Sequence, residues 1–320
     1  MQQNPKDEGG QRTKVRKVLV DAEQAGQRID NFLRRELPGV PKNRIYRIVR
    51  RGEVRVNGGR VRVEYKLLEG DEVRVPPARI REEGGPPTDK QAASVAERVL
   101  FEDKRLLVID KPSGIAVHGG SGVSHGVIEM LRHARPDLKD LSLAHRLDRE
   151  TSGCLVLAKR RSALRELHEQ FREGRVEKNY LGLAVGDWQL GDQLIDEPLF
   201  VQNRQGGERH VIVSREGKPA QTRVALSRKH GKYSLLQCSP VTGRTHQIRV
   251  HLEHYDHPLL GDERYGEGDA NKAAKKLGLK RLFLHAQSIA FPDNSGNEHH
   301  FTSPLADDLE QFLQRLAKKR

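Results

Sequence analysis

The sequence predicts an α+β protein in which a small, basic α/β module precedes a larger domain. We expect that larger domain to be built on a mixed, mostly antiparallel β-sheet with flanking helices. The 320 residues are too many for one small module and fit two domains. Positive charge is concentrated in the first part. Strand-like segments of the second part are not separated by regular crossover helices, which argues against a doubly wound parallel sheet.

The first module is predicted to contain two helices followed by short strands. Residues 1–17 are polar and have no hydrophobic period, so we expect a disordered leader there. Apolar residues at helical spacing predict one helix closed by Pro38-Gly39 and a second that starts near Pro41 and ends at Gly52. Alternating valines then predict three short strands, at residues 53–56, 60–65 and 69–75. The module as a whole is placed at residues 18–77.

The second of these helices carries arginines with almost no acidic residues beside them. Residues 27–77 contain thirteen basic and seven acidic side chains, a net charge of +6 out of +13 for the whole chain. An arginine-lined helix can bind phosphates with a strong dependence on salt. A solvated helix face is the plainer interpretation, but the lack of acidic partners favours nucleic acid. The candidate RNA-binding residues here are Arg44, Arg47 and Arg51.

The rest of the chain is predicted to form a linker and the second domain. Residues 78–97 are rich in Gly, Pro and charge without a period, so we expect a linker there and the second domain at 98–320. A helix is predicted at residues 162–173, with Ser162 as its N-cap, and another over residues 305–319. Strands are predicted at residues 105–110, 154–159, 180–185 and 232–238.

Composition argues against several classes of protein. No segment approaches the roughly 20 apolar residues that a membrane span needs, and the first residues lack the apolar core of a signal peptide. The two cysteines, Cys154 and Cys238, are too few for a disulfide scaffold or a structural zinc site. We therefore expect a cytoplasmic protein with no membrane partner, and a monomer in the absence of any assembly motif.

The segment 142–159, SLAHRLDRETSGCLVLAK, has the residues best suited to chemistry. Asp148 is enclosed by Arg146 and Arg149, and neighbouring guanidinium groups would keep its carboxylate anionic and available as a base or nucleophile. From composition alone, a structural salt bridge at a strand entrance is the more common outcome.

Other constellations point less strongly to other chemistry. His246, His251, His254 and His257 suggest a metal site, but no HExxH or similar order is present, and we expect no metal. The Gly-rich segment 118–126 lacks the residues of a P-loop or a dinucleotide-binding loop. Ser152 has neither the context of a nucleophile elbow nor a persuasive histidine partner.

Several blocks of the sequence resemble one family in the same order along the chain. HRLDRETSG resembles the signature of pseudouridine synthases, in the branch that modifies large-subunit ribosomal RNA and some transfer RNAs. EKNYLGLAVG, CSPVTGRTHQIRVHL, GDERYG and RLFLHAQSIAF are similar to further blocks of that branch. The first module is similar to the small RNA-binding domain named after ribosomal protein S-four. The resemblance runs from about Val18 to the C-terminal helix.

This resemblance implies an RNA-modifying isomerase and assigns roles to individual residues. Asp148 matches the family's essential carboxylate, and Arg249 matches the arginine that pairs with it. Tyr180 matches the tyrosine that stacks on the target base and is linked to removal of its C5 proton. Arg146 matches the residue that enters the RNA stack where the uridine has left, and His145 beside it is a further RNA-binding candidate.

The implied reaction needs no cofactor, because no redox change occurs and no group comes from outside. The implied partner is 23S ribosomal RNA or an assembly intermediate of the large subunit. The carboxylate's role stays open between attack at C1′, addition to the base and removal of the C2′ proton. Two other functions also stay open, a non-enzymatic ribosome-assembly factor and a metal-dependent nuclease.

Overall fold

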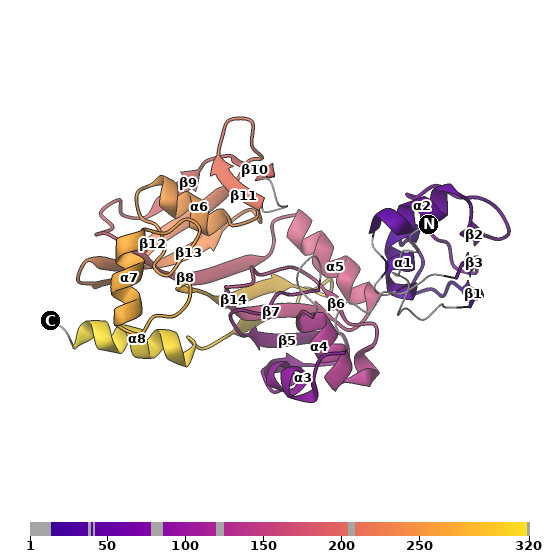
Figure 1. Cartoon of the computed structure of the whole chain (residues 1–320), viewed down its shortest axis with the longest axis horizontal. Helices are drawn as coiled ribbons and strands as arrows, with labels where there is room; N and C mark the ends of the chain where they lie inside the picture. The colour runs from indigo at the N-terminus through magenta and orange to yellow at the C-terminus, as the bar shows by residue number, and fades with distance from the viewer. Residues whose placement is uncertain are drawn as a thin grey trace, which may run out of the picture. The chain divides into compact units, whose positions relative to one another are not determined.

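The computed structural model describes residues 14–37, 40, 42–77, 86–119, 125–203 and 209–318. The chain divides into two compact units, Met1–Pro86 and Pro87–Arg320, which are coloured from indigo to yellow along the chain in Figure 1. Residues 1–13 of the expected leader and residues 78–85 of the expected linker lie outside the described residues.

The first unit packs two helices against a small antiparallel sheet. The helices are α1 (Ile29–Glu36) and α2 (Lys42–Arg50). The strands are β1 (Arg16–Leu19), β2 (Arg55–Val56) and β3 (Glu72–Val75), in the order β1-β3-β2. Both predicted helices are confirmed, and their apolar stripes are buried in one core with residues of the sheet: Ile29, Phe32, Leu33, Leu37, Ile45, Ile48 and Val49.

Two details of the first unit differ from the expectation. Strand β1 begins at Arg16, inside the segment expected to be a disordered leader, because Arg16–Leu19 pairs with the distant β3. Residues 60–65 form no strand, since the chain turns back tightly and the Val56 N–H donates to the Gly59 carbonyl at 3.0 Å. Val63 is nevertheless buried. The alternation of valines therefore predicts correctly which side chain is buried, but the strand predicted from it is wrong.

The second unit is built on a ten-stranded sheet. Its strand order is β4-β5-β7-β14-β8-β13-β12-β9, with β15 beside β14 and β6 beside β7. Among these described strands, β14 and β7 form the one parallel pair, so the predicted mixed, mostly antiparallel sheet is confirmed. The strands are β4 (Val99–Glu102), β5 (Leu106–Lys111), β6 (Ser142–Leu143), β7 (Ser152–Ala158), β8 (Glu177–Val185), β9 (Gln193–Asp196), β12 (Gln221–His230), β13 (Tyr233–Pro240), β14 (Leu284–Pro292) and β15 (Glu298–Thr302). A separate hairpin pairs β10 (Leu199–Asn203) with β11 (Arg209–Val213).

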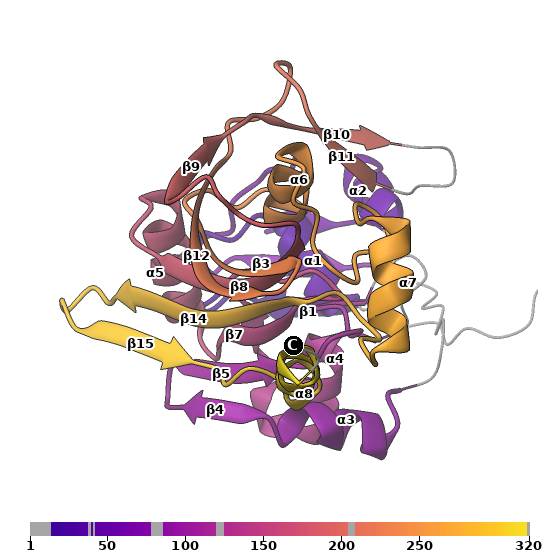
Figure 2. The same cartoon turned by 90° about the vertical axis from the view of Figure 1, so that its left-hand side faces the viewer.

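Helices cover both faces of this sheet (Figure 1 and Figure 2). Residues of α3 and α4 share a core with Leu107 and Ile109 of β5, whereas residues of α5 share one with Leu106 and Val108, which point to the opposite face. In the other half, α6 packs on one face and α7 with α8 on the other. The helices are α3 (Asp89–Ala96), α4 (Val127–Ala134), α5 (Arg161–Arg172), α6 (Gln247–His254), α7 (Gly268–Lys276) and α8 (Asp307–Ala317).

Local helix boundaries differ from the expectation at two places. Residues 89–96, expected to belong to the linker, form α3, because Thr88 and Gln91 make a capping box and Val95 is buried against α4. Helix α5 begins at Arg161, and its N-cap is Arg160, without a side-chain cap, rather than Ser162. None of the described helices is both long and apolar enough to span a membrane.

Candidate active site

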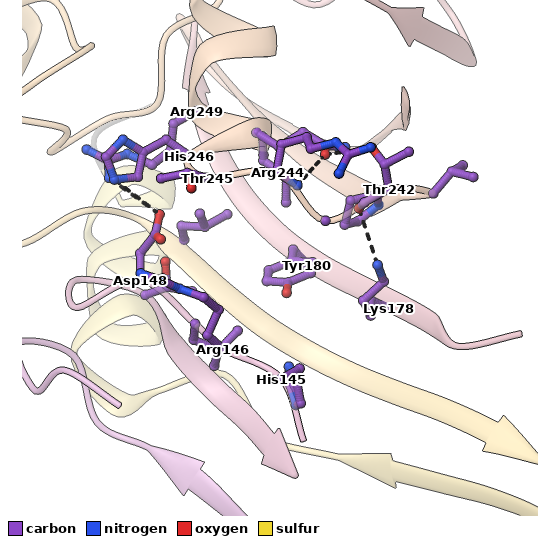
Figure 3. A pocket seen from close by; sticks show the side chains of 18 of the residues that line it. His145, Arg146, Asp148, Lys178, Tyr180, Thr242, Arg244, Thr245, His246 and Arg249 are labelled. Carbon is purple, nitrogen blue, oxygen red and sulfur yellow. Dashed lines mark hydrogen bonds and ion pairs between the residues drawn. The ribbon is translucent and has the colours of Figure 1, made fainter. Parts of the chain in front are cut away.

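Asp148 lies in the loop that connects β6 to β7 of the large sheet. This loop borders a cavity of about 430 Å³, which is within the size range of small-ligand sites. Strand β8 and the segment leading into α6 supply the other walls. Figure 3 shows the Asp148 carboxylate pointing toward His246 and Arg249 across this cavity. The side chain of Asp148 is 21% exposed, so it is accessible from the cavity.

Arg249 of α6 connects Asp148 to a second, fully buried carboxylate. The Arg249 Nε and Nη2 atoms donate to the two Asp262 oxygens at 2.7 and 2.8 Å, and its Nη1 lies 3.5 Å from Asp148 Oδ2. Burial lowers the pKa of Arg249, but the bonds to Asp262 and the charge of Asp148 outweigh it, so the net direction is upward. Arg249 is therefore a cation held in place by Asp262, and its third guanidinium nitrogen, Nη1, faces Asp148.

Tyr180 stands on β8 at the junction of two hydrophobic cores and lines the same cavity. Burial, followed by the negative charge of Asp148, raises the pKa of Tyr180 above its ordinary value. The phenol is therefore protonated at neutral pH. Its position beside Asp148 places an aromatic ring where a base can stack.

Cationic side chains surround the cavity. Arg146 and Arg244 are exposed on its rim, and Lys178 lies deeper, with its Nζ donating to the Thr242 carbonyl at 3.3 Å. Burial lowers the pKa of Lys178 to about 8. A second cavity of about 720 Å³ shares Asp148 and Arg146 with the first and adds Arg149, Arg264, Lys280 and Arg281 to its walls. This concentration of positive charge suits a polyanion.

His145 lines the cavity but already makes contacts within the protein. Its Nε2 accepts the Val156 N–H of β7 at 3.0 Å, and its ring lies 5.4 Å from that of Phe171. Burial, with a smaller contribution from the charge of Lys178, lowers the pKa of His145 to about 3. The ring is thus neutral and attached to the strand, and its expected role in RNA binding stays a prediction.

Three further residues lie at the site, of which the sequence suggests only His246, and that one as a possible metal ligand. Asp262 and Tyr265 lie together after α6, and the Arg249 guanidinium carbon lies 5.0 Å from the centre of the Tyr265 ring. His246 precedes α6 and places its Nε2 3.9 Å from Asp148 Oδ2. The blocks GDERYG and HQIR contain these residues, but no local pattern indicates that they meet Asp148.

The RNA-binding candidates of the first unit lie on or just after α2. Arg44, Arg47 and Arg51 are exposed, and none of the described carboxylates forms an ion pair with them. The apolar face of α2 is buried in the core, so these arginines point into solvent. This arrangement leaves them available for phosphates.

The residues considered for other chemistries have structural partners. Within the described ranges, no group of three or more His, Cys, Asp or Glu side chains is arranged to hold a metal ion. His251 instead contacts Thr222 and the Glu197 carbonyl, at 2.9 and 3.0 Å. Ser152 does have a histidine partner, contrary to expectation, because His285 Nδ1 lies 2.9 Å from its hydroxyl. Both residues are buried, at 2% and 0% exposure, so this pair is structural.

Comparison with known families places both units. Residues 105–254 match the RNA pseudouridylate synthase family, and residues 27–73 match the S4 domain family. Two solved human structures resemble the chain. RNA Pseudouridylate Synthase Domain Containing 4 has a TM-score of 0.60 and 28% identity, with 72% of this chain and 96% of that chain covered. RNA Pseudouridylate Synthase Domain Containing 1 has a TM-score of 0.54 and 25% identity, with 68% and 94% covered.

Relatives of nearly the same length are more similar still. The ribosomal large subunit pseudouridine synthase C of Escherichia coli (strain K12) is 50% identical over 312 residues, covering 96% of this chain and 98% of that protein. The protein of the same name from Haemophilus influenzae is 49% identical over 311 residues, with 96% of each covered. The resemblances stated for both parts of the sequence are thereby confirmed. The chain belongs to the pseudouridine synthase family of isomerases and carries an S4 domain ahead of its synthase domain.

Proposed function

We propose that this protein converts uridines of 23S ribosomal RNA to pseudouridine, with Asp148 as the reactive carboxylate. The observation that carries the proposal is the joint placement of Asp148, Arg249 and Tyr180 around one cavity. The relatives that match over nearly the full length are named for the large ribosomal subunit, which supports the choice of RNA. Such a substrate also supports a cytoplasmic location for the protein.

The reaction rearranges one nucleotide without adding or losing a group. The N1–C1′ bond breaks, the uracil turns and C5 bonds to C1′, while C5 loses a proton and N1 gains one. The Asp148 carboxylate lies beside the Arg249 guanidinium and can act at the sugar or the base. Tyr180 offers its ring for stacking against the displaced base, and burial of the phenol keeps it protonated.

The target uridine has to leave its helix before it can enter the cavity, which costs a few kcal/mol unless it is unpaired. Arg146 is exposed on the cavity rim, and its planar guanidinium can stack in the gap that the uridine leaves. The cations around both cavities can bind the flanking phosphates. The arginines of α2 add a second, independent contact to RNA.

Mapping of the product tests the choice of substrate. The protein is incubated separately with unmodified 23S and 16S ribosomal RNA, and pseudouridines are located by carbodiimide labelling and primer extension. We expect discrete new stops in 23S RNA and none in 16S RNA. Stops confined to 16S RNA would contradict the proposed substrate while leaving the synthase activity in place.

A further inference from the structure

His246 adopts a backbone conformation that few residues with a side chain adopt. Its φ of 55° and ψ of 21° lie in the left-handed region, immediately before α6. Among the described non-glycine residues, Asn57 and Asp256 are the two others with positive φ, and neither lines the cavity. Unfavourable backbone conformations of this kind are concentrated at functional sites. Here the conformation directs the imidazole toward Asp148.

The ring of His246 is fixed from its other side by Tyr265. The Tyr265 hydroxyl lies 2.8 Å from His246 Nδ1, and the same oxygen accepts the Val211 N–H at 3.0 Å. Because the oxygen accepts from Val211, the phenolic hydrogen is available to Nδ1. Tyr265 is itself buried against the Arg249 guanidinium, so it has little freedom to turn away.

This hydrogen bond determines which nitrogen of His246 carries the hydrogen. Burial lowers the pKa of His246 to about 4, with Arg249 and Arg264 lowering it further and Asp148 and Asp262 opposing them. The ring is therefore neutral at pH 7 and has one N–H. With Nδ1 accepting from Tyr265, that hydrogen is on Nε2, which faces Asp148 Oδ2 at 3.9 Å. A donor toward a carboxylate is also the electrostatically favoured arrangement.

We infer that His246 is a positioning residue, which orients the Asp148 carboxylate through an Nε2–H donor whose tautomer is set by Tyr265. This inference rests on the proposed role of Asp148 in the reaction. Arg249 Nη1 approaches the same Asp148 oxygen at 3.5 Å, so the two donors converge on one side of the carboxylate. Both distances exceed a hydrogen bond, and such contacts commonly shorten when substrate fills the site.

The test compares three substitutions of His246 that differ in where they place a donor. In His246→Gln the amide nitrogen reaches the position of Nε2, whereas in His246→Asn it reaches only that of Nδ1. His246→Ala has no donor. Among residues with a side chain, Asn is one of those that best tolerate a left-handed backbone, so a loss in that variant is not a backbone effect. Pseudouridine formation is measured under single-turnover conditions, and RNA affinity is measured separately by filter binding.

We expect the Ala and Asn variants to lose about 10- to 100-fold in single-turnover rate with RNA affinity unchanged, and the Gln variant to recover most of the rate. Tyr265→Phe should also slow the reaction, and the double variant with His246→Ala should be no slower than His246→Ala alone, because both changes act through one contact. A thermal melt of each variant shows whether it is folded.

Equal rates in wild-type protein and His246→Ala, with Asp148→Asn inactive in the same assay, would overturn the inference and leave the proposed function intact. Equal losses in the Gln and Asn variants would also overturn it, since a side chain that only fills space does not distinguish the two donors. An inactive wild-type protein would instead contradict the proposed function, and the inference with it.

Discussion

At the residue scale, the central feature is one arginine shared by two carboxylates of unequal burial. Asp262 is buried and also accepts the backbone N–H groups of Arg264 and Tyr265, at 2.9 and 3.0 Å. Burial raises the pKa of Asp262, but the Arg249 hydrogen bond and charge, with the two backbone bonds, lower it overall. Arg249 thus belongs structurally to Asp262 and presents its remaining nitrogen to Asp148. The Arg249–Asp262 pair is therefore expected to contribute to folding stability, and the Arg249–Asp148 contact to the reaction.

Asp262→Asn should therefore destabilise the synthase domain. The substitution leaves the Arg249 guanidinium buried without its charged partner, a change that costs about 3–5 kcal/mol. The free energy of unfolding is measured by urea titration of the fluorescence of Trp188, the single tryptophan of the chain. The exposed neighbour Glu263→Gln is the control. Equal stability of the two variants would show that the buried pair contributes nothing.

The stability of the synthase domain should also depend on pH through its buried histidines. Burial lowers the pKa of His145 to about 3 and of His246 to about 4, and it lowers the pKa of His251 and His285, all from an ordinary value of 6.5. As pH falls below 6.5, the unfolded chain therefore binds protons that the folded protein does not. Stability is full above that pH and falls toward pH 4, by up to about 1.4 kcal/mol per pH unit for each histidine.

Urea titrations of Trp188 fluorescence at several pH values between those limits measure this slope. His251→Gln should make the slope shallower, because the unfolded chain then binds one proton fewer relative to the folded protein. His254→Gln, which replaces an exposed histidine of the same helix, is the matched control. Stability that stays constant or increases on acidification would contradict the assignment of these histidines as neutral in the folded protein.

At the element scale, the site depends on how β7 meets β14. These two strands pair in parallel over two residues each. Ser152 and Gly153 of β7, which directly follow the Asp148 loop, lie opposite His285 and Ala286 of β14. Gly153 has a φ of 110°, and a Cβ added there would lie 2.2 Å from the Ala286 carbonyl oxygen. Only glycine allows this approach, which fixes where the loop leaves the sheet.

Gly153→Ala should accordingly push β14 away from β7 and disturb the loop that carries Asp148. We expect a loss of at least about 2 kcal/mol in the free energy of unfolding, together with a lower rate of pseudouridine formation. Gly268→Ala at the start of α7 is the matched control, since a Cβ there has no neighbour within 4 Å. A Gly153→Ala protein as stable and active as this control would refute the close-approach argument.

Helices and strands are predicted best from the sequence where the hydrophobic pattern of the segment itself determines them. The helices α1, α2 and α8 and the strands β5, β7, β8 and β13 follow from hydrophobic period and were expected. Strand β1 was not, because its pairing with β3 is formed across more than fifty residues. For the same reason Asp148, Tyr180 and Arg249 were found by resemblance of their blocks. The roles of His246, Asp262 and Tyr265 depend on contacts that only the folded chain creates.

At the scale of the whole molecule, binding and chemistry are assigned to different units. The S4 domain carries +6 of the net charge between residues 27 and 77, and the synthase domain contains the cavity with Asp148. An independent RNA contact strengthens binding of a large RNA through effective concentration without altering the reactive groups. The two contributions are therefore separable by mutation.

Replacing Arg44, Arg47 and Arg51 together by Ala should weaken binding to ribosomal RNA and flatten its salt dependence. Each lost phosphate contact reduces the slope of log K against log salt by about 0.7 to 0.9. The rate on a short stem-loop at saturating concentration should stay unchanged. The control removes three lysines of α7, at 272, 275 and 276, and should change both quantities less. Unchanged affinity and slope in the arginine variant would identify α2 as a solvated face only.

The most direct test of the central claim is release of tritium from RNA whose uridines carry tritium at C5. Wild-type protein, Asp148→Asn and wild-type protein with EDTA are compared on 23S ribosomal RNA. We expect release with the wild-type protein, undiminished by EDTA, and none with Asp148→Asn. The RNA affinity of Asp148→Asn should stay close to that of the wild type, because the Asn side chain has nearly the same volume as Asp. Substantial release by Asp148→Asn would contradict the assignment of Asp148 as the reactive group.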